Sequence, residues 1–156
     1  MHPITLRRAT IADLETLLRF EQGVLSAERP YDANLKSGLV HYYDIGSLLE
    51  SDDAMFLVAE SGRDAVGCGF ARVDAAKPYM KHSHEAYLGL MYVDPAYRRL
   101  GINGKIMDSL KSWCRSRHIT EIRLEVYGRN VGAVKAYEKA GFSGSIVEMR
   151  MSLRDE

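Results

Sequence analysis

Six short stretches of the chain carry the alternating or wholly apolar patterns that are typical of β-strands. In chain order they are residues 4–10, 54–60, 65–75, 85–93, 121–127 and 145–153. The stretch "EAYLGLMYV" (85–93) is apolar on both of its faces, which predicts a central strand that is covered on both sides. Because Gly89 in its middle weakens a strand, we expect a β-bulge or a close backbone approach at this position.

Between these strands, apolar residues recur with the period of an amphipathic helix. A first helix is predicted after Thr10, which suits the N-cap position, and a second one somewhere within 34–50. The clearest helical pattern covers 102–117, and a shorter one over 131–140 ends at Gly141. The order of strands and helices predicts an α/β fold, in which a mixed sheet has helices on its faces.

Composition and charge narrow the class of protein. The chain has 156 residues, of which 46% are hydrophobic, and this suits one domain over 1–156 with a substantial core. The 21 basic residues balance the 21 acidic ones, which argues against a nucleic-acid partner. The apolar stretches are too short to span a bilayer and "MHPITLRRAT" has no signal-peptide pattern, so we expect no membrane contact and a cytoplasmic location. Cys68 and Cys114 lie inside apolar patterns and are expected to be reduced core residues.

The stretch "AYRRLGINGKI" (96–106) combines features that bind phosphate. Two arginines precede two glycines and the start of a predicted helix. The N–H groups and the positive dipole end of a helix N-terminus attract anions, and glycine lets the backbone approach them closely. The spacing matches neither GxxxxGK[ST] nor GxGxxG, so the stretch is neither a P-loop nor a dinucleotide fingerprint. The alternative is a plain helix start with a solvated arginine pair.

The stretches "VDPAYRRLGINGKIM" and "LEVYGRNVGAVKAYEKAGF" together resemble the GNAT family of N-acetyltransferases. The first resembles the family's motif A, [RQ]xxGx[GA], and matches it at Arg98 and Gly101. The resemblance covers about residues 54–153. It departs from the family at Asn103, where the family has glycine or alanine and this chain places Gly104 one residue later. The second stretch resembles motif B and matches it at Asn130, Ala133, Tyr137, Gly141 and Phe142.

The resemblance implies a GNAT fold, which is a mixed, mostly antiparallel sheet of six to seven strands with helices on both faces and a splayed central strand pair. It implies acetyl-CoA as co-substrate, with the pantetheine arm in the splayed gap and a backbone N–H near Leu90 polarising the thioester carbonyl. We expect Gly104 to compensate for Asn103, whose own backbone N–H is aimed at phosphate. The implied coenzyme-binding residues are Met91, Tyr92, Val93, Arg98, Arg99, Leu100, Gly101, Ile102, Asn103, Gly104, Asn130 and Tyr137.

The implied activity is the direct transfer of an acetyl group to a primary amine. Tyr137 is our candidate acid for the leaving thiolate, because a phenol with a pKa of about 10 is protonated at neutral pH. Packing against the core is the alternative for this tyrosine. Glu85 is our candidate base, with a pKa raised by apolar neighbours. A solvated glutamate is the alternative there, and Tyr87, Tyr92 and His84 are other candidate bases.

The sequence does not identify the acceptor. A peptide N-terminus, a lysine, a polyamine and a small metabolite amine all fit, and a coenzyme A-binding sensor without turnover is the alternative function. The stretch "HSHE" (82–85) has no evident third or fourth metal ligand, so no metal site is expected. A monomer or a homodimer is expected. The residues expected near the acceptor are Tyr31, Asp32, Tyr42, Tyr43, Asp44 and Tyr79.

Overall fold

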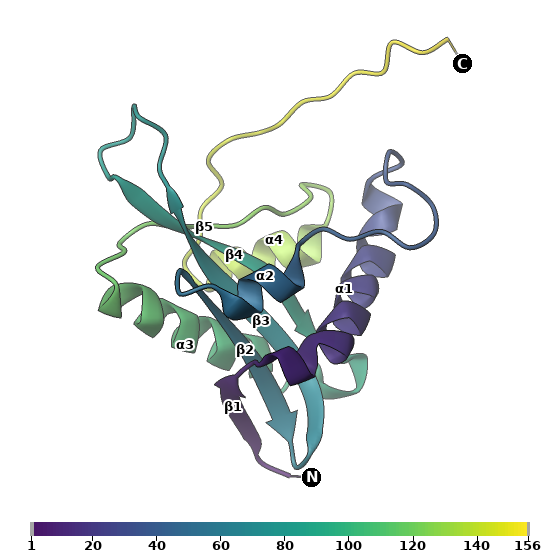
Figure 1. The fold of residues 1–156 in the computed structure, drawn as a ribbon. Helices are drawn as coiled ribbons and strands as arrows, with labels where there is room; N and C mark the ends of the chain where they lie inside the picture. Colours follow the sequence, from purple (N-terminus) through teal and green to yellow (C-terminus); the bar gives the residue numbers. More distant parts are fainter. Residues whose placement is uncertain (1, 156) are drawn as a thin grey trace. The chain divides into compact units, whose positions relative to one another are not determined.

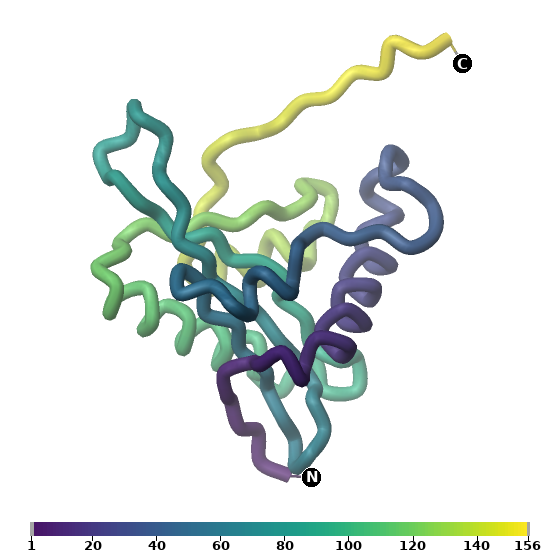
Figure 2. Tube along the Cα trace, in the orientation of Figure 1, coloured from purple at the N-terminus to yellow at the C-terminus, as the bar shows by residue number. Residues whose placement is uncertain are grey.

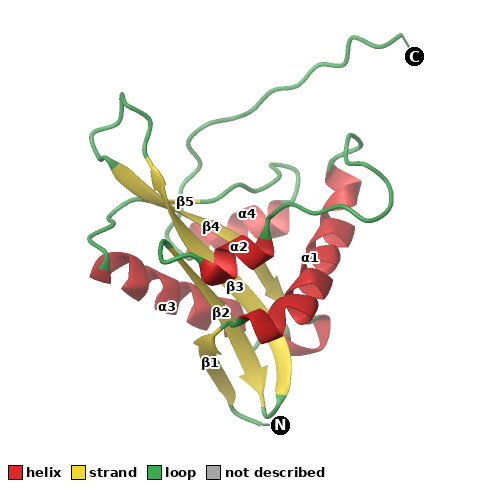
Figure 3. Ribbon diagram, viewed as in Figure 1, coloured by secondary structure: helices red, strands yellow, loops and turns green. Residues whose placement is uncertain are grey.

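The computed structural model of the chain describes residues 2–155. Contacts between residues divide the chain into two units, residues 1–125 and residues 126–156. The first unit is an α/β sandwich with one sheet, and the second contains a single helix among the residues that the structure describes (Figure 1, Figure 3). The α/β class expected from the sequence is therefore confirmed, and the whole candidate phosphate stretch lies in the first unit.

The sheet has five strands in the order β1-β2-β3-β4-β5, so each strand pairs with its neighbour in the chain. The first four strands pair in antiparallel fashion. Figure 2 shows that β1 lies alongside β2, although more than forty residues separate the two strands in the chain. β5 runs parallel to β4, and such a pair needs a crossover, which α3 provides. The strands are β1 Ile4–Arg8, β2 Ala54–Ser61, β3 Asp64–Ala75, β4 His84–Val93 and β5 Ile122–Arg123.

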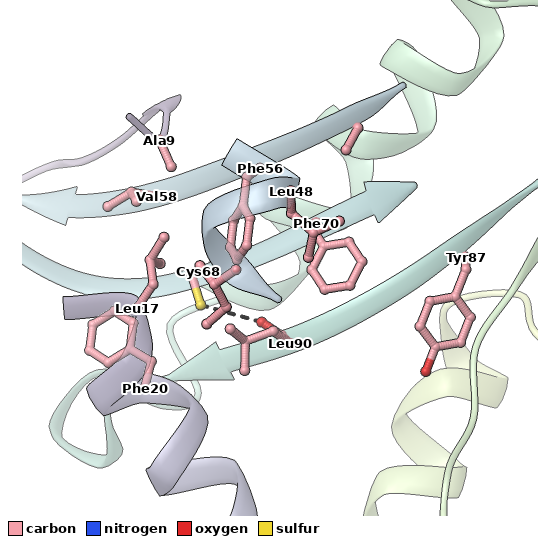
Figure 4. Packing of buried hydrophobic residues seen from close by; sticks show 12 residues of the cluster. Ala9, Leu17, Phe20, Leu48, Phe56, Val58, Cys68, Phe70, Tyr87 and Leu90 are labelled. Carbon is pink, nitrogen blue, oxygen red and sulfur yellow. Dashed lines mark hydrogen bonds between the residues drawn. The ribbon is translucent and has the colours of Figure 1, made fainter. Parts of the chain in front are cut away.

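Helices cover both faces of this sheet. α1 (Leu14–Glu28) and α2 (Ile45–Glu50) lie on one face, and α3 (Ile102–Ser116) lies on the other (Figure 1). Successive residues of β3 point to opposite faces of the sheet, so each face has its own helices. Phe70 packs with side chains of α1 and α2, whereas a Cβ at the preceding Gly69 would meet α3. Figure 4 shows the first of these faces, where Phe70 is fully buried beside Phe56.

A β-bulge interrupts β4 in its buried part. Cys68 pairs with Tyr92 and Phe70 pairs with Gly89, so two residues of β4, Leu90 and Met91, stand opposite the single residue between them on β3. Leu90 has a φ of 46°, in the left-handed region that few residues other than glycine adopt. The Cys68 thiol donates to the Leu90 carbonyl at 3.3 Å (Figure 4). The bulge expected next to a weak strand position is confirmed.

Gly89 itself is the site of a close approach. A Cβ at this residue would lie 2.4 Å from Cζ of Phe70 and 3.1 Å from the hydroxyl oxygen of Tyr43. Only hydrogen fits in that space, since real Cβ atoms do not approach other heavy atoms so closely. The glycine therefore allows an aromatic cluster to pack directly on the backbone beside the bulge.

β4 and β5 pair over only two positions. Ala86 faces Ile122 and Tyr87 faces Arg123, and the ladder ends there although β4 continues to Val93. This short ladder matches the splayed central pair expected from the family resemblance. The predicted strand over 121–127 is correspondingly too long.

The second unit contains α4 (Val131–Lys139), in agreement with the predicted short helix. The strand predicted over 145–153 is wrong, because these residues form no strand in the structure. The sheet accordingly has five strands, not six to seven. An alternating pattern shows which face a strand would bury, but it does not supply a pairing partner. The large apolar residues of this segment are all more than 80% exposed, namely Ile146, Val147, Met149, Met151 and Leu153.

The first N-terminal helix ends before Pro30, and the second is short and lies within the predicted range. α1 ends at Glu28, and Pro30 follows within a short 3-10 turn. Of the helix predicted within 34–50, only α2 forms, and Asp44 caps it by accepting from the Ser47 backbone N–H at 3.1 Å. This hydrogen bond fixes the loop between α1 and α2 at the point where α2 begins.

Candidate functional site

The loop between β4 and α3 has an unusual backbone. Asp94 accepts from the Ala96 N–H at 2.9 Å and begins a 3-10 turn over Pro95–Tyr97. Arg99 and Gly101 then adopt left-handed conformations, with φ of 66° and 79°. Two left-handed residues so close together turn the chain sharply into the first turn of α3.

This turn leaves backbone donors exposed at the helix N-terminus. The first backbone bond of α3 runs from the Lys105 N–H to the Gly101 carbonyl at 3.1 Å. The N–H groups of Ile102, Asn103 and Gly104 precede it and have no acceptor within the helix. A Cβ at Gly104 would meet no heavy atom within 4 Å, so the protein's own packing does not require glycine there. The open backbone and the dipole end fit a phosphate group.

The two arginines, Arg98 and Arg99, lie in the loop directly before α3. Both side chains are exposed, and Arg98 Nε donates to the Val93 carbonyl at 3.3 Å. That bond ties the base of the loop to the end of β4 and leaves the remaining guanidinium nitrogens available. Leu100 is also exposed, at 44%. The predicted residues 98–104 thus place two exposed arginines directly before the backbone donors of the first helical turn.

Asn103 is the residue that departs from the family, and its side chain is poorly satisfied. Its Oδ1 atom is buried and has no hydrogen-bond partner among the described residues. We predict that Asn103→Ala increases the free energy of unfolding by about 1 kcal/mol, because it removes an unsatisfied acceptor and improves helix propensity. Urea denaturation measures this change.

Asn130→Ala is the matched control, because that asparagine caps α4 by accepting from the Ala133 N–H at 3.3 Å. Its replacement should lower the free energy of unfolding by about 1 kcal/mol. A loss of stability in Asn103→Ala as large as in the control would show that the Asn103 side chain has a partner after all.

The residues predicted to line the pantetheine arm flank the bulge. Met91 packs over Gly69 on the α3 side, where its sulfur would be 2.5 Å from a Cβ at that glycine. The Tyr92 ring stacks on Phe20 of α1 with centroids 4.6 Å apart, and burial raises the pKa of Tyr92. The side chains are therefore used for packing, and a ligand along β4 would meet mainly their backbone.

Glu85 lies in a different environment from the one expected. Its carboxylate accepts from His82 Nε2 at 3.0 Å and pairs with Arg123. The hydrogen bond from His82 and the neighbouring guanidinium hold its pKa below the usual range, whereas the sequence led us to expect a raised pKa. It also lies five residues from Leu90, which is about 17 Å along a strand. The expected pKa shift is wrong, and the proposed role as base stays a prediction.

A buried carboxylate that the sequence did not reveal orders the loop before α2. Glu21 on α1 is fully buried and accepts from three donors. They are His41 Nδ1 at 2.7 Å, the Tyr42 N–H at 2.9 Å and the Tyr43 N–H at 3.1 Å. No sequence signal marks this residue, because an acidic residue in an amphipathic helix is normally solvated. Its partners are about twenty residues away in the chain.

The residues expected around an acceptor do not all come together. Tyr42 and Tyr43 are held by the same buried glutamate, and Tyr43 reaches the bulge region. Tyr79 is 75% exposed in the loop between β3 and β4, where Lys77 lies over its ring. Asp44 serves as a helix cap, and Asp32 accepts from the Asn34 N–H in a local turn.

The second unit contains all five matches to motif B, including the predicted site residues Asn130 and Tyr137. Asn130 caps α4, as expected. Tyr137 packs its ring edge-on against Phe142, with centroids 6.0 Å apart. The Phe142 N–H donates to the Tyr137 carbonyl at 3.0 Å, and Gly141 between them has a φ of 108°. The sequence "GF" therefore ends α4 with a left-handed glycine.

The histidines near Glu85 contact neighbouring polar side chains, and both cysteines are buried. His82 pairs with Glu85, and His84 lies 3.1 Å from the Ser83 hydroxyl. Among residues 2–155, no three His, Cys, Asp or Glu side chains are grouped so that they could hold a metal ion. Cys68 and Cys114 are free and buried, in agreement with the sequence analysis. Within the same residues, no helix has both the length and the apolar character needed to cross a bilayer.

Comparison with known sequences gives a match over most of the chain. The acetyltransferase (GNAT) family matches residues 13–142, which include both motif-like stretches. A probable N-acetyltransferase, camello from Xenopus laevis, is 31% identical over 101 residues. That match covers 65% of this chain and 44% of the relative, so the chain spans less than half of the relative's length.

Comparison with solved structures gives the same fold. A GCN5-related N-acetyltransferase from Ralstonia eutropha has a TM-score of 0.77 at 20% identity, over 97% of this chain and 99% of the other. A predicted acetyltransferase from Clostridium acetobutylicum, solved with acetyl-CoA, has a TM-score of 0.73 at 20% identity, over 97% of both chains. Identities this low show the fold alone. Taken with the family match over residues 13–142, they show that this chain belongs to the GNAT family of acetyltransferases.

Proposed function

We propose that the chain is an acetyl-CoA-dependent N-acetyltransferase that transfers an acetyl group directly to a primary amine. The observation that carries the proposal is the continuity of two features within the first unit. The bulged strand β4 leads directly into the loop whose arginines and free N–H groups surround the start of α3. The first feature suits a thioester carbonyl and the second suits a diphosphate, and both groups occur in acetyl-CoA.

The loop supports the coenzyme part of the proposal. The N–H groups of Ile102, Asn103 and Gly104 would bind the pyrophosphate, assisted by the charges of Arg98 and Arg99. The open space at the glycine of the first helical turn would let the phosphate oxygens approach the backbone. The likeness to a structure solved with acetyl-CoA supports the same coenzyme.

The bulge supports the reaction part of the proposal. A residue in a strained left-handed conformation costs about 1–3 kcal/mol, and such strain is concentrated at functional sites. Here Leu90 has that conformation, and it and Met91 have no paired residue on β3. A backbone N–H of this bulge would stabilise charge that develops on a carbonyl oxygen. Tyr137 would then donate a proton to the leaving thiolate, as the resemblance to motif B implies.

A direct assay tests the proposed function. Calorimetry with acetyl-CoA measures coenzyme binding, and the release of free thiol measures turnover. A tetrapeptide with a free N-terminus, lysine, spermidine and ethanolamine represent the classes of acceptor. Binding together with amine-dependent thiol release is the expected result. Binding without thiol release for any amine would instead favour a coenzyme A-binding sensor, and absence of binding would contradict both functions.

Replacing both arginines tests the phosphate assignment. We predict that the double variant Arg98→Ala, Arg99→Ala binds acetyl-CoA about a hundredfold more weakly, because each charge-assisted hydrogen bond contributes about 1.5–3 kcal/mol. Turnover at saturating acetyl-CoA should change much less. Arg115→Ala removes a positive charge from the last turn of the same helix and is the control. Equal losses of affinity in the control and the double variant would contradict a specific phosphate site.

A further inference from the structure

Three polar side chains, among them one residue expected near the acceptor and one of the alternative candidate bases, form a connected series in the first unit. Tyr43 precedes α2, Tyr87 lies on β4, and Glu125 follows β5. The hydroxyl oxygens of Tyr43 and Tyr87 are 3.5 Å apart, and the Tyr87 hydroxyl donates to Glu125 Oε1 at 3.1 Å. Tyr87 is only 8% exposed, whereas Glu125 is exposed. The series therefore leads from the interior of the unit to its surface.

The inner end of this series lies at the bulge of β4. The Tyr43 hydroxyl oxygen is 3.1 Å from the position of a Cβ at Gly89. Burial raises the pKa of Tyr43, and hydrogen bonding with Tyr87 and with the Leu90 backbone lowers it in part. The buried carboxylate of Glu21 fixes the Tyr43 backbone. Tyr43 is thus held beside the backbone that we assign to the thioester carbonyl.

The donors and acceptors give the series a direction. An ionised carboxylate only accepts, so the single proton of Tyr87 is used by Glu125. The Tyr87 oxygen must then accept from Tyr43, which leaves a lone pair of the Tyr43 oxygen for an outside N–H. The separation of 3.5 Å between the phenols exceeds the usual O–H···O distance. Hydrogen bonds of this kind commonly shorten when substrate binds.

We propose that Tyr43, Tyr87 and Glu125 carry the proton of the acceptor amine from the bulge to solvent. The inference rests on the proposed acetyl transfer. The ammonium gives a proton to the Tyr43 oxygen, Tyr43 gives its own proton to Tyr87, and Tyr87 gives its own to Glu125. The ammonium becomes a neutral amine with a free electron pair, the carboxylate becomes a carboxylic acid, and both phenols end neutral. Glu125 is exposed and then releases the proton to water.

Charged groups of both signs lie around the series. Arg72 lies over the Tyr87 ring at 5.0 Å and Arg123 at 4.9 Å, each measured to the ring centroid. Arg72 pairs with Asp74 and Arg123 pairs with Glu85, so each cation is partly neutralised. Glu28 also faces Tyr43, and burial raises the pKa of this glutamate. The direction of transfer is therefore set by the hydrogen bonds of the series and not by a net positive charge.

The pH dependence of turnover tests the proposal. In Glu125→Gln and in Tyr87→Phe, kcat for thiol release with the best amine of the panel should fall about tenfold to a hundredfold near neutral pH. The loss should disappear as the pH approaches the pKa of that amine, about 8 for a peptide N-terminus and about 10 for a lysine side chain, because the free amine no longer needs a proton acceptor. KM for acetyl-CoA should not change. Glu121→Gln, at an exposed glutamate on the same segment, is the control.

Each outcome of the kinetic test decides between the proposals. A loss that recovers with rising pH supports the proton path. A loss that is the same at every pH indicates a purely structural role and overturns it, and so does unchanged kcat in both variants. Wild-type protein that binds acetyl-CoA but acetylates no amine overturns the proposed function, and the proton path with it.

A measurement without acetyl-CoA gives a second test. Burial, Tyr43 and the charge of Glu125 all raise the pKa of Tyr87, so this phenol stays neutral in the folded protein. The ¹³Cζ chemical shift of labelled tyrosines at neutral pH reports the hydrogen bond that each phenol donates. Glu125→Gln should shift the Tyr87 signal, whereas Glu121→Gln should not. An unchanged Tyr87 signal in Glu125→Gln would show that the two groups are not in contact in solution and would overturn the path.

Discussion

Tyr137→Phe should reduce kcat for thiol release by about 10²–10⁴-fold, which is the usual contribution of a general acid. The phenol of Tyr137 is the group that the motif resemblance assigns to the leaving thiolate, and phenylalanine cannot donate a proton. The ring itself is retained, so its edge-on contact with Phe142 should persist. Acetyl-CoA affinity, measured by calorimetry, should therefore remain close to that of the wild type.

Tyr127→Phe is the matched control, because it removes a hydroxyl from another tyrosine of the same unit. It should leave kcat nearly unchanged. Unchanged turnover in Tyr137→Phe would remove the acid role and favour packing as the reason for this tyrosine. A fall in acetyl-CoA affinity that equals the fall in kcat would indicate a binding role.

Gly89→Ala should lower the free energy of unfolding by about 3 kcal/mol, the upper part of the range for overpacked cores. The new Cβ would lie 2.4 Å from Cζ of Phe70. That ring is fully buried, with Phe56 at 5.3 Å and Tyr43 at 5.0 Å between ring centroids, so it has no free space to move into. Urea denaturation measures the change. Because Tyr43 also contacts this position, turnover should fall in the same variant.

Gly104→Ala provides the comparison for stability. A Cβ at this helical position meets no heavy atom within 4 Å. Alanine has the higher helix propensity, so the free energy of unfolding should increase by up to about 1 kcal/mol. The same substitution thus has opposite effects at the two glycines. Equal stability of Gly89→Ala and the wild type would show that Phe70 moves away at little cost.

Several parts of the fold and the site follow from local patterns. The apolar stripe of 102–117 predicted α3 to within one residue, and the glycines and arginines before it marked a sharp left-handed turn. Gly89 signalled both a bulge and a close approach in a strand that is otherwise apolar. These predictions succeed because periodicity, caps and glycine act within a few residues of the chain.

Other predictions failed where a distant partner was needed. Glu85 has apolar neighbours in the sequence, but the hydrogen bond from the nearby His82 and the pairing with the distant Arg123 of β5 lower its pKa. The alternating segment 145–153 forms no strand, since a strand also requires an available edge. The sequence around Glu85 does not show that Arg123 lies beside it. The sequence of 145–153 likewise does not show whether a strand edge is available for pairing.

The sequence by itself determined the family, the glycine- and arginine-containing turn before α3 and the weak point of the central strand. Only the tertiary structure decided which polar groups meet around that strand. Glu21 binds the backbone of Tyr43, and Tyr43 approaches Tyr87 and the bulge, although these residues are far apart in the chain. Burial makes such contacts strong, because a buried polar group without a partner is costly. The partner is chosen by the fold as a whole, and no short pattern in the sequence records that choice.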